Sequence, residues 1–368
     1  MFTLRQRLAG TAALLLAVAA CSKDATAPKP LDPTAALASL NGVDSTFQTP
    51  AVQSFLAVTA LFNAGGTPAA PFGQVGALLQ ATAPRIPGPG AGPEMGAALK
   101  VLQHAMTGTE AILPDSLLGK TFIWDTTQAR YVKSDTGGAP PNGIRFELYA
   151  LDLDRHIIKP LVQVGHLDLI DKSTGAAQTL EVVVASSSFT YIDYTVSGSG
   201  TLSAFTLTAS GFIRNSVREL DFSISYTVTS ASCAITEQFD DAADNAHLTF
   251  SFGITTTSDT SHTVTLNFDY HVGTHDIALN GGGAVDSLTE DLVATVKVDG
   301  NVFALISAVG LRETVVPSLT DGNGQPLSNE NRLLLFKMFV MVGRSLEWLN
   351  DFVGPFIALA AIGVLLSL

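Results

Sequence analysis

The chain has 368 residues, of which 46% are hydrophobic and only 14% are charged, so it can bury a large core beneath a sparsely charged surface. Its 20 basic and 33 acidic residues give a formal charge of −13, and no basic cluster could neutralise phosphates, which argues against nucleic acid as a partner. Two cysteines cannot form a disulfide framework and seven scattered histidines do not define a metal site, so we expect no cofactor.

The first twenty residues have the pattern of an export signal. Arg5 and Arg7 precede an apolar run at 12–18, and small residues then lead to Cys21. The apolar run is too short to span a bilayer. We therefore expect residues 1–20 to be a signal peptide. An ordinary secreted protein, in which Cys21 has no special role, is the alternative.

The residues V-A-A-C at 18–21 resemble the lipobox of bacterial lipoproteins. The resemblance implies that the signal is removed before Cys21 and that Cys21 becomes the lipidation site, so that the membrane is a partner through this lipid. In such lipoproteins an aspartate after the cysteine favours the inner membrane, whereas this chain has Ser22. The resemblance therefore implies an exported protein, lipid-anchored at the cell envelope and most consistent with the outer membrane.

The next segments are expected to be a tether and a helical leader. Residues 21–31 are polar and contain prolines, which is typical of a linker. Residues 32–118 are rich in alanine, and the pairs Asp-Pro at 32–33 and Thr-Pro at 49–50 are typical of a helix cap followed by proline at the first helical position. A further helix is predicted at 94–106.

Residues 119–312 are predicted to be an antiparallel β domain. Apolar residues alternate with serine, threonine and other polar residues, as in 220–228 and 262–270, which indicates strands with one apolar and one wet face. Short turns are predicted, among other places, at 197–200 and 281–283, giving about a dozen strands. Open twisted sheets rarely exceed about ten strands, so we expect a curved half-barrel or a closed barrel.

Residues 313–368 are predicted to form hydrophobic helices. Ser328 can cap the first of them, and Phe352–Leu368 contains no charged residue. Such a segment must leave water, and we expect it to pack on the apolar face of the sheet, with membrane insertion as the alternative. The predicted fold is therefore mainly β with flanking helices, in which N-terminal and C-terminal helices cover the apolar face of a large antiparallel meander.

Two groups of residues are candidate sites on the β domain. An apolar sheet face could bind a hydrophobic ligand through Phe222, Ile224, Phe250, Phe252, Leu266 and Phe268. His271 and His275, with Asp269, have the spacing of one strand face and are weak candidates for a metal site, although a solvated strand ending at Gly273 is the simpler interpretation.

Other polar residues are explained more simply by local structure. Asp152 and Asp154 would form a carboxylate pair if they shared one strand face, but the adjacent Arg155 and His156 favour a strand end or loop. Cys233 is expected to be a buried, unreactive thiol. No nucleophile, base and orienting group can be assembled from the sequence, so we expect no catalytic residues and no enzyme.

Two hypotheses of function remain. The first is a lipoprotein that binds a lipid or other hydrophobic ligand without catalysis, similar in general layout to the lipid-carrier lipoproteins of the LolA and LolB type. The second is a structural or interaction lipoprotein whose sheet face is filled by its own helices. A ligand-sized cavity, or lipid retained by the purified protein, would favour the first.

Overall fold

The computed structural model describes residues 33–63, 111–174, 177–201, 204–229, 231–258, 261–286, 288–311, 318–338, 352–356 and 359. Cys21, the expected tether and the predicted helix at 94–106 lie outside these residues. None of the helices within the described ranges has the length and hydropathy needed to cross a membrane.

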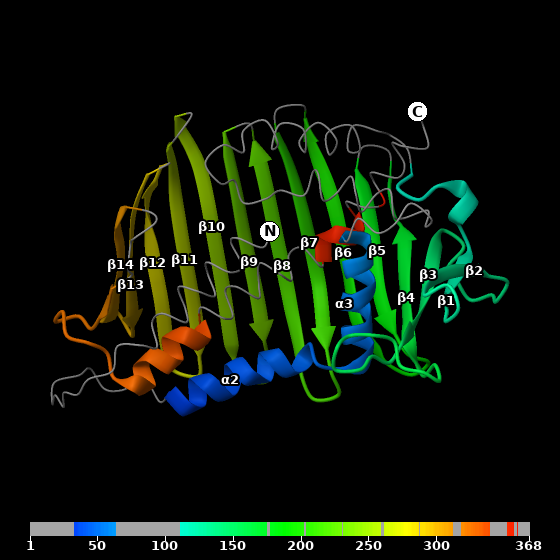
Figure 1. Ribbon diagram of the computed structural model, residues 1–368, viewed down its shortest axis with the longest axis horizontal. Helices are drawn as coiled ribbons and strands as arrows, with labels where there is room; N and C mark the ends of the chain where they lie inside the picture. Colours follow the sequence, from blue (N-terminus) through cyan, green and yellow to red (C-terminus); the bar gives the residue numbers. More distant parts are fainter. Residues whose placement is uncertain are drawn as a thin grey trace. The chain divides into compact units, whose positions relative to one another are not determined.

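The protein is mainly β, and the 15 strands of the described residues form one sheet (Figure 1). Strands β3 to β15 follow one another in sequence order, and β1 and β2 complete the sheet beyond β3. β1 pairs with β3 in parallel, whereas the other strand pairs of the described chain are antiparallel. The mainly β fold with a large antiparallel meander is confirmed. The first and last strands of the sheet do not pair with each other, so the sheet is open and the predicted alternative of a closed barrel is wrong.

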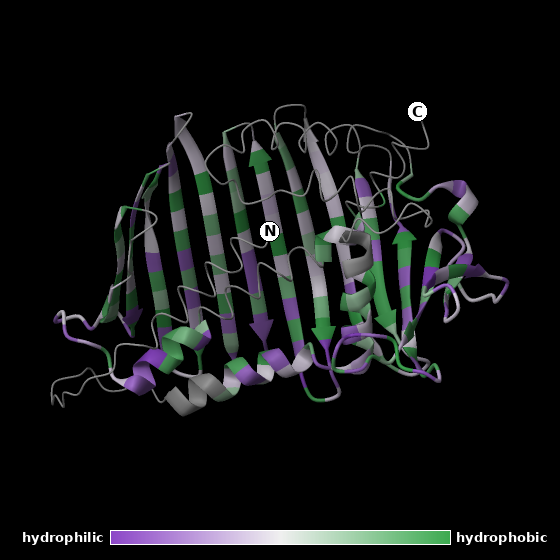
Figure 2. Cartoon of the chain, in the orientation of Figure 1, coloured by the Kyte–Doolittle hydropathy of each residue, from purple (hydrophilic) through white to green (hydrophobic). Residues whose placement is uncertain are grey.

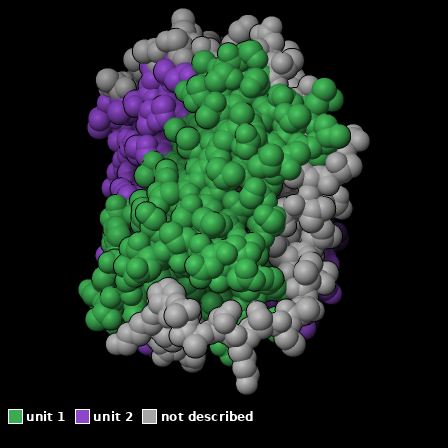
Figure 3. Space-filling view, turned by 90° about the vertical axis from the view of Figure 1, so that its left-hand side faces the viewer, with its two compact units in different colours: residues 1–43, 85–91, 231–347 green, residues 44–84, 92–230, 348–368 purple. Residues whose placement is uncertain are grey.

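The chain divides into two compact units, which Figure 3 colours separately. Unit 1 comprises residues 1–43, 85–91 and 231–347, and unit 2 comprises 44–84, 92–230 and 348–368. The strands of unit 2 are β1 (Lys120–Asp125), β2 (Arg130–Ser134), β3 (Gly143–Tyr149), β4 (Gln163–Asp171), β5 (Gln178–Ala185), β6 (Thr190–Thr201), β7 (Ala204–Arg214) and β8 (Glu219–Thr229). A short 3-10 helix, η1 (Asp115–Leu117), precedes them.

Unit 1 contains the remaining strands of the sheet. They are β9 (Ser232–Asp241), β10 (Ala246–Ser258), β11 (Ser261–Val272), β12 (His275–Val285), β13 (Thr289–Val298), β14 (Asn301–Leu311) and β15 (Ser318–Thr320). Alternate residues of the strands are buried, and Figure 2 shows the matching alternation of hydropathy. A helix that begins at residue 329 carries the buried Leu334 and Leu335, and Ser328 Oγ caps it by accepting a hydrogen bond from the Asn331 N–H at 3.3 Å.

Two predicted turns are wrong. Residues 197–200 lie inside β6, and residues 281–283 lie in the middle of β12. The glycines in β12 have a packing role, because a Cβ atom added to Gly281 would lie 2.5 Å from the Cβ of Ala294 on the neighbouring strand. Glycine therefore permits close approach of two strands here rather than reversal of the chain.

The helices α2 (Pro33–Thr46) and α3 (Pro50–Asn63) begin at the two prolines that the sequence predicts. In unit 2, α3 packs against β3, β4, β5 and β6. Phe55 and Val52 of this helix are fully buried, and the Ser54 hydroxyl accepts a hydrogen bond from the Tyr149 N–H at 3.1 Å. Burial of its apolar residues explains why α3 is stable, since a helix of this length is marginal in isolation.

The carboxyl-terminal residues 352–356 dock on the sheet of unit 2. The Phe352 ring stacks on Phe222 of β8, with centroids 4.7 Å apart and planes 11° apart, and meets Tyr194 of β6 edge-on at 5.3 Å. The Tyr194 hydroxyl donates a hydrogen bond to the Phe352 carbonyl oxygen at 2.9 Å. For these described residues, packing of the C-terminal segment on the sheet is confirmed.

Candidate functional site

The apolar face of unit 1 consists of rows of side chains that run across the strands. Strand register aligns one residue from each strand in a row, and every second row lies on the same face. Two adjacent rows, here called the inner rows, are buried: Phe239, Leu248, Tyr270, Ile277 and Val298, then Glu237, Phe250, Phe268, Leu279, Val296 and Ala304. These rows form the core of the unit.

The next two rows on this face are equally apolar but less buried. Their residues on β9, together with Ile254, are buried, whereas Phe252 of β10 and the residues on β11 to β14 are only half-buried. We call the half-buried residues the apolar patch: Phe252, Val264, Leu266, Gly281, Gly283, Leu292, Ala294, Ile306 and Ala308. No member has a polar side chain, and strand β13 approaches the backbone of β12 closely at the two glycines.

The six residues predicted to bind a ligand fall into three environments. Phe222 and Ile224 belong to unit 2 and are buried, and Phe222 is already in contact with Phe352. The other four belong to unit 1, where two lie in the inner rows and two in the apolar patch: Phe250 and Phe268, and Phe252 and Leu266, respectively. The structure therefore leaves only Phe252 and Leu266 of this set partly open.

His271 and His275 do not share a strand face, so the predicted geometry of this weak metal candidate is wrong. A hairpin turn at 273–274 separates them, with Gly273 in the left-handed region at φ 62°, which glycine adopts without steric cost. His271 is opposite Asp276 on the wet face of the sheet. His275 is opposite Val272, two residues from the buried Tyr270–Ile277 pair, and so lies on the other face. The His271 Nδ1 atom lies 2.7 Å from Asp276 Oδ1, and the His275 Nδ1 atom lies 2.9 Å from Asp299 Oδ2.

The neighbour of His271 on its own face is His247, which the sequence interpretation missed. His247 of β10 is directly opposite His271 of β11, in a row that continues to Asp240 on β9 and Asp276 on β12. The His247 Nδ1 atom lies 2.5 Å from Asp240 Oδ1. Burial raises the pKa of Asp240, but the hydrogen bonds from His247 and Gln238 outweigh it and lower this pKa overall.

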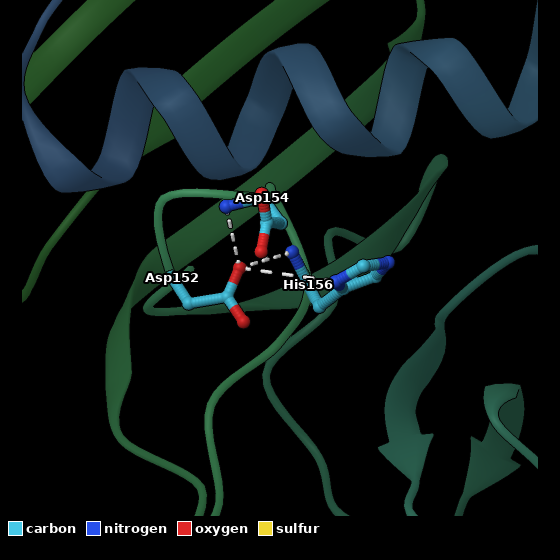
Figure 4. Close-up of side chains that lie close together, drawn as sticks. All are labelled: Asp152, Asp154 and His156. Atoms are coloured by element: carbon cyan, nitrogen blue, oxygen red, sulfur yellow. Dashed lines mark hydrogen bonds and ion pairs between the residues drawn. The ribbon is translucent and has the colours of Figure 1, made fainter.

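Asp152, Asp154 and His156 form the only group in the described ranges in which three potential metal-ligand atoms all lie within 4.8 Å of one another (Figure 4). They lie in the loop between β3 and β4, so a shared strand face is wrong and the loop interpretation is confirmed. Asp152 Oδ1 accepts hydrogen bonds from the N–H groups of Asp154 and His156, both at 2.9 Å. All three residues are exposed, and this carboxylate has a structural role because it holds the turn.

A second polar cluster lies on β3 and β4 of unit 2. Arg145 Nε and Nη2 each donate a hydrogen bond to Asp168, both at 2.7 Å, and Glu147 is directly opposite His166. Gln163 Nε2 donates to the Glu147 carboxylate. The bidentate ion pair between Arg145 and Asp168 links the neighbouring strands β3 and β4 and stabilises their register.

Burial shifts the titration of two members of this cluster in opposite directions. Desolvation raises the pKa of Glu147 overall. The positive charge of Arg145 opposes this rise, and the negative charge of Asp168 adds to it. Desolvation, followed by the positive charge of Arg145, lowers the pKa of His166 below 6.5. Each shift favours the uncharged form of its residue, as expected for ionisable groups that are partly removed from water.

Comparison with known proteins gives no further assignment, because no family model matches this chain and neither a curated protein nor a solved structure is significantly similar to it.

Proposed function

We propose that this protein is a lipid-anchored envelope protein that binds a lipid or other hydrophobic ligand on the apolar patch of unit 1, without catalysis. The observation that carries this proposal is the difference in burial between neighbouring rows of one apolar face. The inner rows are closed from water, whereas the apolar patch beside them is only half-buried. Contiguous exposed apolar surface is a feature of binding sites, because burying it on binding is favourable by about 25 cal/mol per Å².

The chemistry of the patch favours an acyl chain as its occupant. Across β11 to β14 its rows contain Val264, Leu266, Leu292 and Ile306 together with small residues, and no side chain that donates or accepts a hydrogen bond. A protein partner would bring peptide groups that need hydrogen-bonding partners, whereas a hydrocarbon chain has none to satisfy.

Anchoring through Cys21 is the second part of the proposal. It is supported by the V-A-A-C sequence that follows an apolar run, and Ser22 is consistent with the outer membrane. Acyl chains on Cys21 would hold the folded units near a bilayer, where lipids are abundant. The anchor and the patch are independent, so either part of the proposal can fail without the other.

The alternative function, a structural lipoprotein with a self-filled core, draws support from unit 2. There, Phe352 of the chain itself covers Phe222 and Tyr194. We therefore restrict the proposed ligand site to unit 1.

The test is titration of the full chain with a fluorescent fatty acid, comparing Leu266→Asn with Leu305→Asn. Leu266 belongs to the patch, whereas Leu305 is 38% exposed on the opposite face of β14. An amide left unpaired beneath a bound chain costs about 1–3 kcal/mol, so Leu266→Asn should weaken binding about 5- to 150-fold and Leu305→Asn should not. Equal effects of the two substitutions, or no saturable binding, would contradict the proposal.

A further inference from the structure

The face of unit 1 opposite the apolar patch carries a row of four polar residues, which crosses strands β9 to β12 near one end of each strand. Asp240, His247, His271 and Asp276 occupy consecutive strands β9 to β12 and are aligned by strand register. In Figure 2 hydrophilic residues gather toward this end of β9 and β11. The two imidazoles are direct cross-strand neighbours, a relation that brings Cβ atoms to about 4.5–5.5 Å.

Each imidazole is oriented by a carboxylate through the same ring nitrogen. The Nδ1 atoms of His247 and His271 lie 2.5 Å and 2.7 Å from Asp240 and Asp276, respectively. A neutral imidazole that donates from Nδ1 presents the lone pair of Nε2. The Nε2 atom of His247 now contacts the Thr249 hydroxyl at 3.1 Å, and a hydroxyl can rotate away when a stronger partner arrives.

This arrangement matches what a late divalent transition metal needs from a protein. Metal-binding histidines commonly donate their second ring nitrogen to a carboxylate, which fixes the tautomer and makes the ligating nitrogen more basic. Two Zn–N bonds of about 2.0–2.1 Å with tetrahedral geometry place the nitrogens about 3.3 Å apart, within reach of cross-strand imidazoles. Water would complete the coordination, because the only three ligand atoms that lie within 4.8 Å of one another in the described residues belong to Asp152, Asp154 and His156.

We propose that His247 and His271 bind a divalent late transition metal such as Zn²⁺ between their Nε2 atoms, with Asp240 and Asp276 as orienting partners. Imidazole nitrogens favour Zn²⁺, Ni²⁺ and Cu²⁺ over Ca²⁺ and Mg²⁺, which prefer oxygen ligands. The side chains of His247 and His271 are 45% and 39% exposed, so a metal ion can reach them from solvent without opening the fold. The site is independent of the proposed hydrophobic ligand, since it lies on the other face of the sheet.

The experiment is calorimetric titration of the untagged full chain in detergent with ZnCl₂ at pH 7.5. We expect one saturable event, and His247→Ala and His271→Ala should each lower the affinity at least tenfold. Asp276→Ala should lower it about 10- to 100-fold, because it removes only the orienting partner. Circular dichroism of each variant without metal checks that it is folded, and His247→Gln replaces the alanine variant if that one does not fold.

Two control variants distinguish this site from two other histidines that face carboxylates. His275→Ala removes the imidazole paired with Asp299, and His156→Ala removes the imidazole of the exposed loop cluster. Both variants should bind Zn²⁺ as the wild type does. The proposal is overturned if Zn²⁺ shows no saturable binding, or if either control abolishes binding while His247→Ala and His271→Ala retain it.

Discussion

Replacement of Phe352 by alanine tests whether the carboxyl-terminal segment is part of the core of unit 2. Phe352 is fully buried, stacks on Phe222 at 4.7 Å and contacts Tyr194 at 5.3 Å. Phe352→Ala removes these ring contacts but keeps the backbone carbonyl that accepts the Tyr194 hydrogen bond. Truncation of a buried phenylalanine costs about 3–5 kcal/mol through lost burial and the cavity left behind.

The measurement is equilibrium unfolding in urea, followed by circular dichroism, with thermal unfolding in parallel. At about 2–4 °C per kcal/mol for a unit of this size, the midpoint of thermal unfolding should fall by about 6–20 °C. Val217→Ala is the control, because Val217 is 86% exposed and its substitution should change stability by less than about 0.5 kcal/mol. If Phe352→Ala is as stable as this control, the docked segment contributes nothing to the core and our account of unit 2 is wrong.

Three further predictions concern pH, packing and anchoring. Because the pKa of His166 is lowered in the folded state, unfolding takes up protons, so stability should decline as the pH falls below 6.5 through the folded-state pKa. His166→Gln should flatten this decline in urea titrations between pH 7.5 and 5, and identical slopes would refute the explanation. Gly283→Ala should destabilise by about 1–3 kcal/mol, because its Cβ would lie 1.7 Å from the Asp291 carbonyl oxygen, whereas Gly137→Ala meets no atom within 4 Å and serves as control. Cys21→Ser should move the protein from the membrane to the soluble fraction, and continued sedimentation with membranes in high salt would disprove lipid anchoring there.

The fold was predictable where alternation is strict. In β8, the apolar residues at every second position from Leu220 to Val228 are all buried, as period-two alternation predicts. Glycine was the misleading signal, because it marks both chain reversal and close approach of strands. At Gly281–Gly283 the second role applies, and only the position of Ala294 on the next strand reveals it.

The site on the wet face was only partly predictable because it depends on strand register. His271 was recognised, but its neighbour His247 lies 24 residues earlier and was missed. A partial signal was present: folding the chain back at the predicted Ser258–Ser261 turn brings His247 beside the end of β11. A simple reversal there would pair His247 with Val272, and the register shift between Thr256 and Ser258 places it opposite His271 instead. The exposure of the apolar patch had no such signal, since the buried Phe268 and the half-buried Leu266 belong to the same alternating pattern.

The most direct test of ligand binding is mass spectrometry of the lipid that remains noncovalently bound when the full chain is purified from its own membranes. We expect about one lipid molecule per chain, and much less on Leu266→Asn, while Leu305→Asn retains as much as the wild type. Absence of bound lipid from the wild type, or equal amounts on both variants, would contradict binding at the apolar patch and favour a protein that fills its sheet with its own residues.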